Sequence, residues 1–314
     1  MIVISEDVWG PQFAELAKTV ETVQMDDGWQ NRDALKAALA TAQALVVRNR
    51  TQVDRDLLDA APNLRVVARA GVGLDNIDIK AADERGVAVV AGLGVNAVSV
   101  AEFTVGLAIS VMRTIPQHDV ATRAGGWNRT QGREISGKTW GLISCGATGL
   151  ATARLLQGFG VTLLGFDPFV QADDPRLQEL GIGLRSLDDV LANSDIVSIH
   201  SPATPDTRGL INAERISTMR DGAVIVSVGR GEVIDEADLI TALKSGKLAG
   251  AGLDVRATEP PTVGELETLP NVVLAPHVAG ITKESQARIA DVLTSNIGLA
   301  LAGQPVTHAV GAVK

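Results

Sequence analysis

The chain has 314 residues, a length that predicts two domains at roughly 100–200 residues per domain. Charged residues make up 21% and hydrophobic residues 46%, which is typical of a folded globular protein and excludes a disordered chain. The formal net charge of −9 and the aromatic content of 3% argue against a nucleic-acid partner, which needs basic side chains for phosphates and aromatic rings for base stacking.

Signals for metal binding and for targeting are weak. The single cysteine, Cys145, excludes an internal disulfide and a CxxC zinc site, and we expect no metal. The first residues, MIVISEDVWG, lack the basic region and apolar stretch of a signal peptide. The apolar run from Val105 to Met112 is far shorter than the ~20 residues that span a bilayer. We therefore expect a cytoplasmic protein with no membrane partner.

Short runs rich in Val and Ile alternate with helix-like stretches along the whole chain. The runs are continuously apolar, as in strands buried on both faces of a parallel sheet. The alternation predicts βαβ units in doubly wound α/β sheets. The expected strands are Ile2–Ile4, Ala44–Arg48, Arg65–Ala68, Val87–Val90, Trp140–Ile143, Thr162–Phe166, Ile196–Ile199, Ala223–Val228, Ala249–Leu253 and Val272–Leu274. The amphipathic stretches Asp33–Ala40, Asp235–Leu243 and Lys283–Leu301 are expected to be helices.

Two helix starts carry local signals. The sequence Ser99-Val100-Ala101-Glu102 fits a capping box, which predicts a helix that starts at Ser99 and runs to about Val111. Pro116 suits the first turn of the next helix, because its fixed φ and missing N–H are tolerated there.

The strand ending at Ile143 leads into a glycine-containing loop and then a helix expected over Leu150–Gln157. The loop fits the dinucleotide pattern G-x-G-x-x-G, with Ser144 in place of the first glycine and Gly146 and Gly149 in the other two positions. Asp167, at the end of the following strand, is expected to accept from the ribose hydroxyls and to repel a 2′-phosphate, which favours NAD over NADP. Cys145 is interpreted as a packing residue beside the adenosine rather than a nucleophile.

Three charged residues follow strands in the second half of the chain. His277 follows the strand Val272–Leu274, Arg230 follows Ala223–Val228, and Glu259 lies beyond Ala249–Leu253. Ligands of parallel sheets bind at the carboxyl ends of the strands. An arginine can grip the carboxylate of a 2-keto acid, a histidine can donate the proton, and a carboxylate can orient that histidine. His118 and His308 are expected to be solvated or inert, and His200 to be structural more readily than cofactor-lining.

Motifs from about residue 44 to residue 300 resemble the D-isomer-specific 2-hydroxyacid dehydrogenases. The resemblance rests on the segments Arg69–Asp78, Asn96–Glu102, the glycine loop, His200-Ser201-Pro202, Gly229-Arg230-Gly231, Asp254-Val255 with Glu259-Pro260, and Pro276-His277. It implies a catalytic set of Arg230, Glu259 and His277. It also implies cofactor contacts at Gly146, Ala147, Thr148, Gly149, Asp167, Ser201, Val228 and Asp254, and a substrate pocket that includes Arg48, Arg69, Val72, Gly73 and Asn96.

The family resemblance also implies the domain organisation. A Rossmann NAD-binding domain, residues 98–284, is expected to be inserted into a flavodoxin-like substrate domain formed by residues 1–97 and 285–314, with the site in the cleft. A homodimer is expected. The chain departs from the family pattern at Ser144, Ala147, Phe103 and Arg256, and the last of these is expected to place a charge near the nicotinamide.

The function expected from these patterns is NAD-dependent interconversion of a D-2-hydroxy acid and its 2-keto acid. The resemblance favours 3-phosphoglycerate and 3-phosphohydroxypyruvate. Hydroxypyruvate or glyoxylate, and hydroxy acids with a 3-sulfo or 3-phosphono group, remain alternatives. An NADH-sensing corepressor-like binding protein is the alternative from another class. Arg48 and Arg69 end neighbouring strands and are expected either to bind a second anionic group of the substrate or to pair with Asp75, Asp78 or Glu102.

Overall fold

The computed structural model describes residues 1–313 of the chain. These residues form two compact units: unit 1 contains Met1–Asn96 and the segment from Ile281 onward, and unit 2 is Ala97–Gly280. The sequence placed the boundaries a few residues later, at 97/98 and 284/285. Thr282 explains the second difference, because its side chain caps the helix that begins at Lys283 and so ties residues 281–284 to unit 1.

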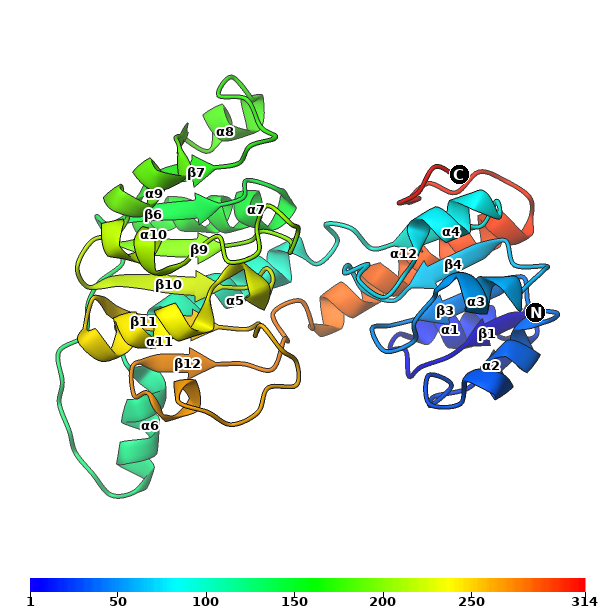
Figure 1. Cartoon of the computed structure of the whole chain (residues 1–314), viewed down its shortest axis with the longest axis horizontal. Helices are drawn as coiled ribbons and strands as arrows, with labels where there is room; N and C mark the ends of the chain where they lie inside the picture. Colours follow the sequence, from blue (N-terminus) through cyan, green and yellow to red (C-terminus); the bar gives the residue numbers. More distant parts are fainter. Residues whose placement is uncertain (314) are drawn as a thin grey trace. The chain divides into compact units, whose positions relative to one another are not determined.

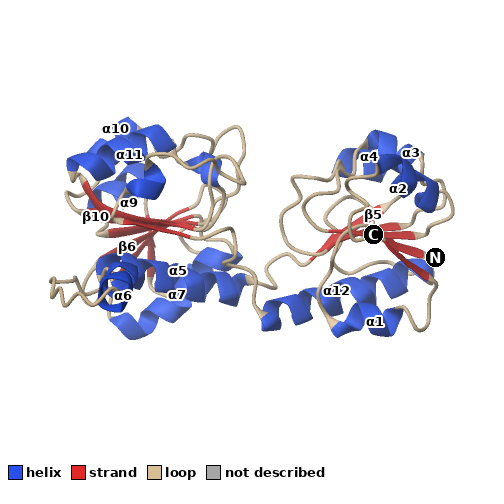
Figure 2. Cartoon of the chain, turned by 90° about the horizontal axis from the view of Figure 1, so that it is seen from below, coloured by secondary structure: helices blue, strands red, loops and turns tan. Residues whose placement is uncertain are grey.

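Unit 1 is built on a five-stranded, entirely parallel sheet in the order β2-β1-β3-β4-β5 (Figure 1). This is the strand order of flavodoxin-like sheets. Its strands are β1 (Ile2–Ile4), β2 (Thr22–Gln24), β3 (Ala44–Val47), β4 (Val66–Arg69) and β5 (Ala88–Ala91). Its helices are α1 (Pro11–Leu16), α2 (Arg32–Leu39), α3 (Arg55–Asp59), α4 (Ile79–Glu84) and α12 (Lys283–Leu301). Figure 2 shows α1 and α12 on one face of the sheet and α2, α3 and α4 on the other.

Unit 2 is built on a seven-stranded parallel sheet in the order β12-β11-β10-β9-β6-β7-β8. The chain runs outward in both directions from the neighbours β6 and β9, as in the dinucleotide-binding doubly wound fold. The strands are β6 (Thr139–Ile143), β7 (Thr162–Phe166), β8 (Ile182–Leu184), β9 (Ile196–Ile199), β10 (Ala223–Ser227), β11 (Leu248–Leu253) and β12 (Val272–Leu274). The fold class expected from the sequence is confirmed.

Helices cover both faces of the sheet of unit 2 (Figure 2). One face carries α5 (Ala97–Met112), α6 (Ile115–Arg123) and α7 (Ala147–Leu156), and the other carries α9 (Leu187–Asn193), α10 (Ala213–Thr218) and α11 (Glu236–Ser245). The unit also contains α8 (Pro175–Glu179) and the short 3₁₀ turns η1 (Gln157–Phe159), η2 (Gly231–Val233) and η3 (Leu266–Thr268). Within residues 1–313, no single helix is long and apolar enough to cross a membrane, and the bent pair α5 and α6 meets that test by length and composition only.

The structure corrects some local predictions. Ser99 is not the residue before a helix, because α5 begins at Ala97 and Ser99 lies buried in its first turn. The helix after the glycine loop begins at Ala147 rather than Leu150. The predicted Pro116 position in the first turn of α6 is confirmed. The sequence did not predict the short edge strands β2 and β8.

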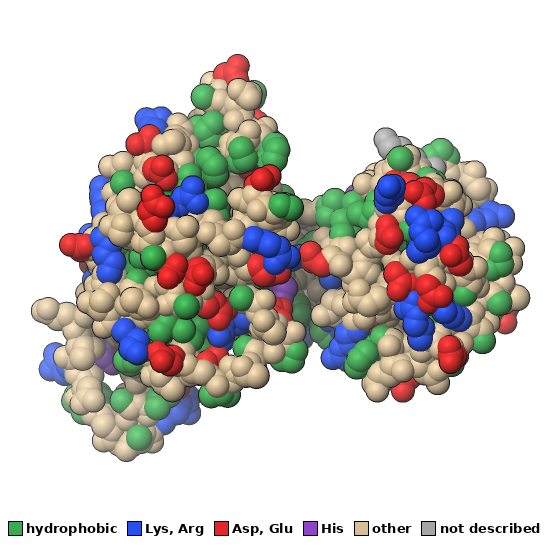
Figure 3. Space-filling model, in the orientation of Figure 1, with side chains coloured by type: hydrophobic (Ala, Val, Ile, Leu, Met, Phe, Trp, Pro, Cys, Tyr) green, Lys and Arg blue, Asp and Glu red, His purple; other side chains and the backbone are tan. Residues whose placement is uncertain are grey.

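The surface of unit 1 mixes charges of both signs. Figure 3 shows basic and acidic side chains side by side over α2, α3 and α4. Ion pairs join Arg32 to Asp54 and Asp56, and Lys36 to Asp56. Such exposed pairs contribute about 0–1 kcal/mol each. The packing of the helices on the two faces of the sheet therefore stabilises the unit far more than these pairs do.

Thr282→Ala is predicted to destabilise the chain. The Thr282 hydroxyl accepts from Ser285 N at 3.0 Å at the start of α12, and loss of such a cap costs about 0.5–2 kcal/mol. Thr294→Ala is the matched control, since that hydroxyl bonds only to carbonyls of its own helix. Urea unfolding monitored by circular dichroism should give a lower midpoint for Thr282→Ala alone. Equal midpoints for both variants would contradict the capping role.

Candidate active site

The glycine loop joins β6 to α7 at the carboxyl edge of the sheet of unit 2. Ser144, which stands in the place of the usual first glycine, has φ +79°, a left-handed conformation that L-residues rarely adopt. Its N–H donates to the carbonyl of Phe166 at 2.8 Å, and its hydroxyl donates to Asp167 Oδ2 at 3.3 Å. The side chain thus gains a partner that a glycine would lack, which offsets part of the cost of this turn.

Gly146 and Gly149 have different roles in the loop. A Cβ on Gly149 would lie 2.2 Å from the carbonyl oxygen of Ser144, so only glycine lets α7 approach the loop this closely. A Cβ on Gly146 would meet only Ser144 Oγ, at 3.7 Å, so the space beside Gly146 is open. The N–H groups of the first turn of α7 have no acceptor within the helix, and a helix N-terminus attracts anions. The residues present therefore fit the pyrophosphate of a dinucleotide, with Ala147 and Thr148 in that first turn.

Asp167 directly follows β7 and fixes the glycine loop by hydrogen bonds. Its Oδ2 accepts from the N–H of Cys145 at 2.9 Å, and its Oδ1 accepts from the N–H of Phe169 at 2.9 Å. A carboxylate has about four acceptor positions, so this set of bonds leaves capacity for a ribose hydroxyl. Burial and the nearby Asp167 raise the pKa of Cys145 to about 12, which supports a packing role for that thiol and opposes a nucleophilic one.

The sequence segment His200-Ser201 follows β9, next to the glycine loop. His200 is buried, its Nε2 lies 2.9 Å from Ser198 Oγ, and Trp140 Nε1 donates to the same oxygen at 2.8 Å. Burial lowers the pKa of His200 to about 3, so the ring is neutral near pH 7. Ser201 and Val228 are also buried, at the ends of neighbouring strands. Their contacts with a cofactor remain predictions.

The structure brings Glu259 and His277 together. Glu259 Oε2 lies 2.7 Å from His277 Nδ1, and Glu259 Oε1 accepts from the N–H of Arg256 at 2.9 Å. Burial alone would raise the pKa of Glu259, but the His277 and Arg256 hydrogen bonds and the charges of His277 and Arg230 lower it below its usual value. A negative Glu259 favours the His277 tautomer or cation that carries a proton on Nδ1, which leaves Nε2 to exchange protons.

Asp254 fixes the loop that presents His277. Its buried carboxylate accepts from the N–H groups of Val278 and Ala279 at 2.8 and 2.9 Å, and its carbonyl accepts from His277 N at 2.8 Å. His277 adopts φ +56° within this loop. Burial raises the pKa of Asp254 despite the two N–H donors. The sequence predicted a cofactor contact for Asp254, and the contacts that the structure gives it are with this loop.

Arg230 follows β10 at the same edge of the sheet. Its Nη1 donates to the carbonyl of Gly229 at 2.9 Å, and its charge contributes to the low pKa of Glu259. Gly231 packs tightly, because a Cβ there would lie 1.9 Å from the carbonyl carbon of Arg256. The predicted catalytic residues Arg230, Glu259 and His277 therefore share one edge of unit 2.

The charge of Arg256 has partners within unit 2, and its nearness to a bound nicotinamide stays a prediction. The guanidinium is held by two carboxylates. It binds both oxygens of Glu236 at 3.0 Å and also contacts Glu267, with a side chain only 10% exposed. The carboxylates of Glu236 and Glu267 therefore compensate the positive charge that Arg256 brings to this position. Phe103, another departure from the family pattern, packs against the apolar core of unit 2.

The predicted substrate-binding residues lie in unit 1. Arg48 follows β3, where its guanidinium contacts Asp7 Oδ1 at 3.1 Å and stacks 4.0 Å from the ring centre of Trp9. Asp7, which the sequence did not suggest, is thus the carboxylate partner of Arg48. Arg69 ends β4 and folds over Gly71, where a Cβ would lie 1.5 Å from Arg69 Nη1.

The backbone around these arginines has additional anchors. Buried Glu6, which the sequence analysis missed, accepts from the N–H groups of Arg48, Arg50 and Thr51. Its only sequence signal is its place after β1. Val72 is half-buried, and Gly73 and Asn96 are buried.

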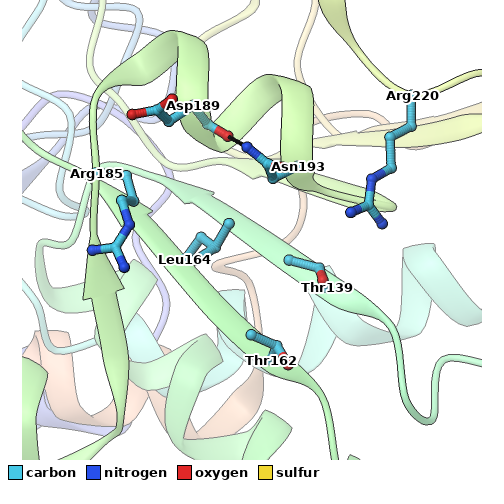
Figure 4. Close-up of a pocket in the computed structure, with 7 residues that line it drawn as sticks. All are labelled: Thr139, Thr162, Leu164, Arg185, Asp189, Asn193 and Arg220. Atoms are coloured by element: carbon cyan, nitrogen blue, oxygen red, sulfur yellow. Dashed lines mark hydrogen bonds between the residues drawn. The ribbon is translucent and has the colours of Figure 1, made fainter.

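A separate hollow of about 400 Å³ lies at the other edge of the sheet of unit 2. Figure 4 shows the side chains around it, including Thr139 and Thr162 at the amino-terminal ends of β6 and β7, and Asn193 donating to the carbonyl of Asp189. Open parallel sheets bind ligands at the carboxyl ends of their strands, so the hollow is not part of the candidate active site.

Residues 105–279 match the sequence profile described as the NAD binding domain of D-isomer specific 2-hydroxyacid dehydrogenases. The chain belongs to this family. It is 42% identical over 312 residues to a D-3-phosphoglycerate dehydrogenase of Mycobacterium tuberculosis (strain ATCC 25618 / H37Rv), covering 99% of this chain and 58% of the relative. A D-3-phosphoglycerate dehydrogenase of Archaeoglobus fulgidus is 37% identical, with coverage of 98% and 59%. The chain thus spans less than two thirds of the length of these relatives.

Solved structures of similar proteins match both units. The TT0316 protein of Thermus thermophilus is 29% identical, with a TM-score of 0.90 and coverage of 98% of this chain and 99% of that one. An NADPH-dependent glyoxylate/hydroxypyruvate reductase of Sinorhizobium meliloti, in complex with NADP and malonate, is 29% identical, with a TM-score of 0.87 and coverage of 99% and 97%. The comparisons therefore support a nicotinamide dinucleotide as the cofactor, and the preference for NAD over NADP stays a prediction.

Gly149→Ala and Gly146→Ala are predicted to have different effects. The first places a methyl group against the Ser144 carbonyl and should lower the melting temperature, because α7 must move away. The second places its methyl group in open space and should leave the melting temperature unchanged, while NADH binding measured by calorimetry weakens at least tenfold. Unchanged NADH affinity in a folded Gly146→Ala variant would contradict the assignment of the loop.

Proposed function

We propose that the chain is an NAD-dependent D-2-hydroxyacid dehydrogenase. The observation that carries the proposal is the 2.7 Å contact of Glu259 Oε2 with His277 Nδ1, at the edge of unit 2 that also holds Arg230 and the glycine loop. A histidine oriented by a carboxylate is suited to move a proton, and the loop is suited to hold a dinucleotide.

Bound NADH would supply the hydride that reduces the carbonyl carbon of a 2-keto acid, and NAD⁺ would accept it in the reverse direction. Arg230 binds the substrate carboxylate through its planar fork and favours negative charge on the neighbouring oxygen. His277 donates a proton from Nε2 to that oxygen during reduction and removes it during oxidation. Glu259 stabilises the positively charged ring before reduction and keeps Nδ1 occupied throughout.

The substrate pair that the comparisons favour is 3-phosphoglycerate and 3-phosphohydroxypyruvate. The support comes from relatives of that name. We propose that Arg48 and Arg69 of unit 1 bind the second anionic group. The glyoxylate/hydroxypyruvate reductase similarity favours a smaller keto acid as the alternative. The expected homodimer and cytoplasmic location belong to the same proposal, the first supported by family membership and the second by the single cysteine.

A substrate panel tests the function directly. Oxidation of NADH by the purified chain should be fastest, in kcat/KM, with 3-phosphohydroxypyruvate, and slower with hydroxypyruvate, glyoxylate, and 3-sulfo or 3-phosphono keto acids. Equal kcat/KM for glyoxylate and 3-phosphohydroxypyruvate would favour the small-acid alternative. Tight NADH binding without turnover of any keto acid would contradict an enzyme and favour a NADH-sensing binding protein.

His277→Gln is predicted to lower kcat by about 10²–10⁴-fold, the contribution typical of a positioned acid. Glu259→Gln should also lower kcat, but by a smaller factor, because the amide retains the shape of the carboxylate and loses its charge. NADH affinity should stay within twofold of the unmodified protein in both variants. A His277→Gln variant that keeps more than a tenth of the activity would exclude His277 as the proton donor.

Asp167→Asn is predicted to relax the preference for NADH over NADPH. The substitution removes the negative charge that would repel a 2′-phosphate and retains an oxygen for the loop N–H groups. The ratio of kcat/KM for the two cofactors should fall at least tenfold. If the unmodified protein used NADPH as well as NADH, the role assigned to Asp167 would be wrong.

Arg48→Ala and Arg69→Ala are each predicted to raise KM for 3-phosphohydroxypyruvate at least tenfold. A charge-assisted hydrogen bond to an anion contributes about 1.5–3 kcal/mol. Glyoxylate has no second anionic group, so it makes no such bond and loses none in these variants. Any glyoxylate activity should therefore change little. Arg55→Ala is the control, because Arg55 pairs with Glu84 on the exposed surface of the same unit. Equal effects on both substrates would show that the two arginines do not select the second anion.

A further inference from the structure

The backbone at Arg256 connects the parts of the candidate active site in unit 2. The Arg256 N–H donates to Glu259 Oε1 at 2.9 Å. The same backbone segment packs against Gly231, where a Cβ would lie 2.1 Å from the carbonyl oxygen of Arg256, and Gly231 follows Arg230. A displacement of Arg256 would therefore reach both Glu259 and the turn that carries Arg230.

Two acidic residues from other elements hold the side chain of Arg256. Glu236, the first residue of α11, binds Nε and Nη2 at 3.0 Å each, and Glu267 in η3 binds Nη1. Glu236 Oε1 also accepts from the N–H of Ala257 at 2.8 Å. Burial and the charge of Glu267 would raise the pKa of Glu236, but the Arg256 and Ala257 bonds lower it overall, so the carboxylate stays charged. The guanidinium fork is thus fixed in position and in orientation.

Apolar packing does not fix the segment that carries Glu259. Residues 257–265 are all exposed, and a hollow of about 250 Å³ lies beside them, lined in part by Thr258, Pro261 and Thr262. The anchors of this segment are polar. Ala257 N donates to Glu236, Gly264 N donates to Glu267 at 2.7 Å, Glu265 pairs with Lys244 at 2.9 Å, and Glu259 adds its own bonds. The two acids that hold Arg256 are therefore also the acids that hold both ends of the segment.

We propose that Arg256, held by Glu236 and Glu267, is a positioning residue that keeps the Glu259 carboxylate aligned on His277. The inference rests on the proposed function, because it assigns the ion cluster a role in orienting the proton donor.

Steady-state kinetics of Arg256→Gln, Glu236→Gln and the double variant test the proposal. Each single change should lower kcat about tenfold and leave the Kd for NADH within twofold, because the cofactor loop does not touch the cluster. The double variant should be no slower than the slower single variant, since either change already breaks the pair. Arg256→Lys should recover part of kcat, because it keeps the charge without the fork. Multiplicative losses in the double variant would contradict a shared positioning role.

Arg220→Gln is the matched control. Arg220 pairs with Asp195 at 3.1 Å, and it lines the hollow at the other edge of the sheet (Figure 4). Its loss removes a similar ion pair from the same unit without touching residues 254–259. If Arg256→Gln and Arg220→Gln lowered the melting temperature alike and neither changed kcat, the Arg256 cluster would be structural only and the proposal would be overturned.

A titration of Glu259 separates this inference from the proposed function. Carbon-13 NMR of the labelled Glu259 carboxyl, assigned with Glu259→Gln, reads its pKa without turnover. The charged groups that act on Glu259 are His277, Arg230 and Asp254. In Arg256→Gln the Arg256 N–H and His277 bonds should loosen, so the pKa of Glu259 should rise toward the ordinary value of 4.5. An unchanged pKa would overturn the positioning role even in an active enzyme, whereas a raised pKa in a chain without turnover would support it and reject the proposed function.

Discussion

The candidate active site of unit 2 depends on a buried carboxylate that does not belong to the expected catalytic set. Asp254 directly follows β11 and accepts from two successive N–H groups of the loop after β12. These bonds hold His277 at a positive φ, from which its Nδ1 reaches Glu259. A buried anion without such donors would be costly, and a loop with such a φ would open without the anion. Each therefore stabilises the other, and the 2.7 Å contact of Glu259 with His277 follows from them.

The glycine loop, on the other side of β9 and β10 in the sheet, is held in the same way. Asp167 accepts from the N–H of Cys145, and Ser144 adopts the left-handed conformation that a glycine would adopt more easily. The Ser144 hydroxyl adds a second donor to the carboxylate, so the departure from the glycine pattern and the acidic residue are coupled. In both loops, a carboxylate at the end of one strand fixes the backbone that follows a neighbouring strand. These polar contacts add to the packing of Cys145 and Ala279 in the core and give both short loops a defined shape.

The fold could be predicted from sequence wherever burial left a clear pattern. The central strands of both sheets are buried on both faces, so they appear as short runs rich in Val and Ile. The edge strands β2 and β8 contain only three residues each, partly exposed, and give no such run.

Residues that follow strands were equally accessible to prediction, which is why Arg230, Glu259 and His277 were placed at one edge. Ion pairs between residues distant in sequence could not be predicted. Arg256 meets Glu236 and Glu267, and Arg48 meets Asp7, only because the fold brings them together. The helix start at Ala97 overrode the Ser99 pattern because Ser99 is buried among core residues of α5.

The ion cluster at Arg256 illustrates why a charge cannot be assigned to a site from its sequence position. Asp254 and Arg256, two positions apart after β11, make contacts in different directions: Asp254 faces the His277 loop, and Arg256 faces α11 and η3. Replacing a buried ion cluster by apolar side chains is often neutral for stability, but removing one member leaves the others uncompensated. An arginine at this position therefore requires both acids, and once they are present its removal is costly. The backbone of Arg256 is thereby fixed at the point where its N–H meets Glu259, so an interaction that contributes little net stability contributes orientation.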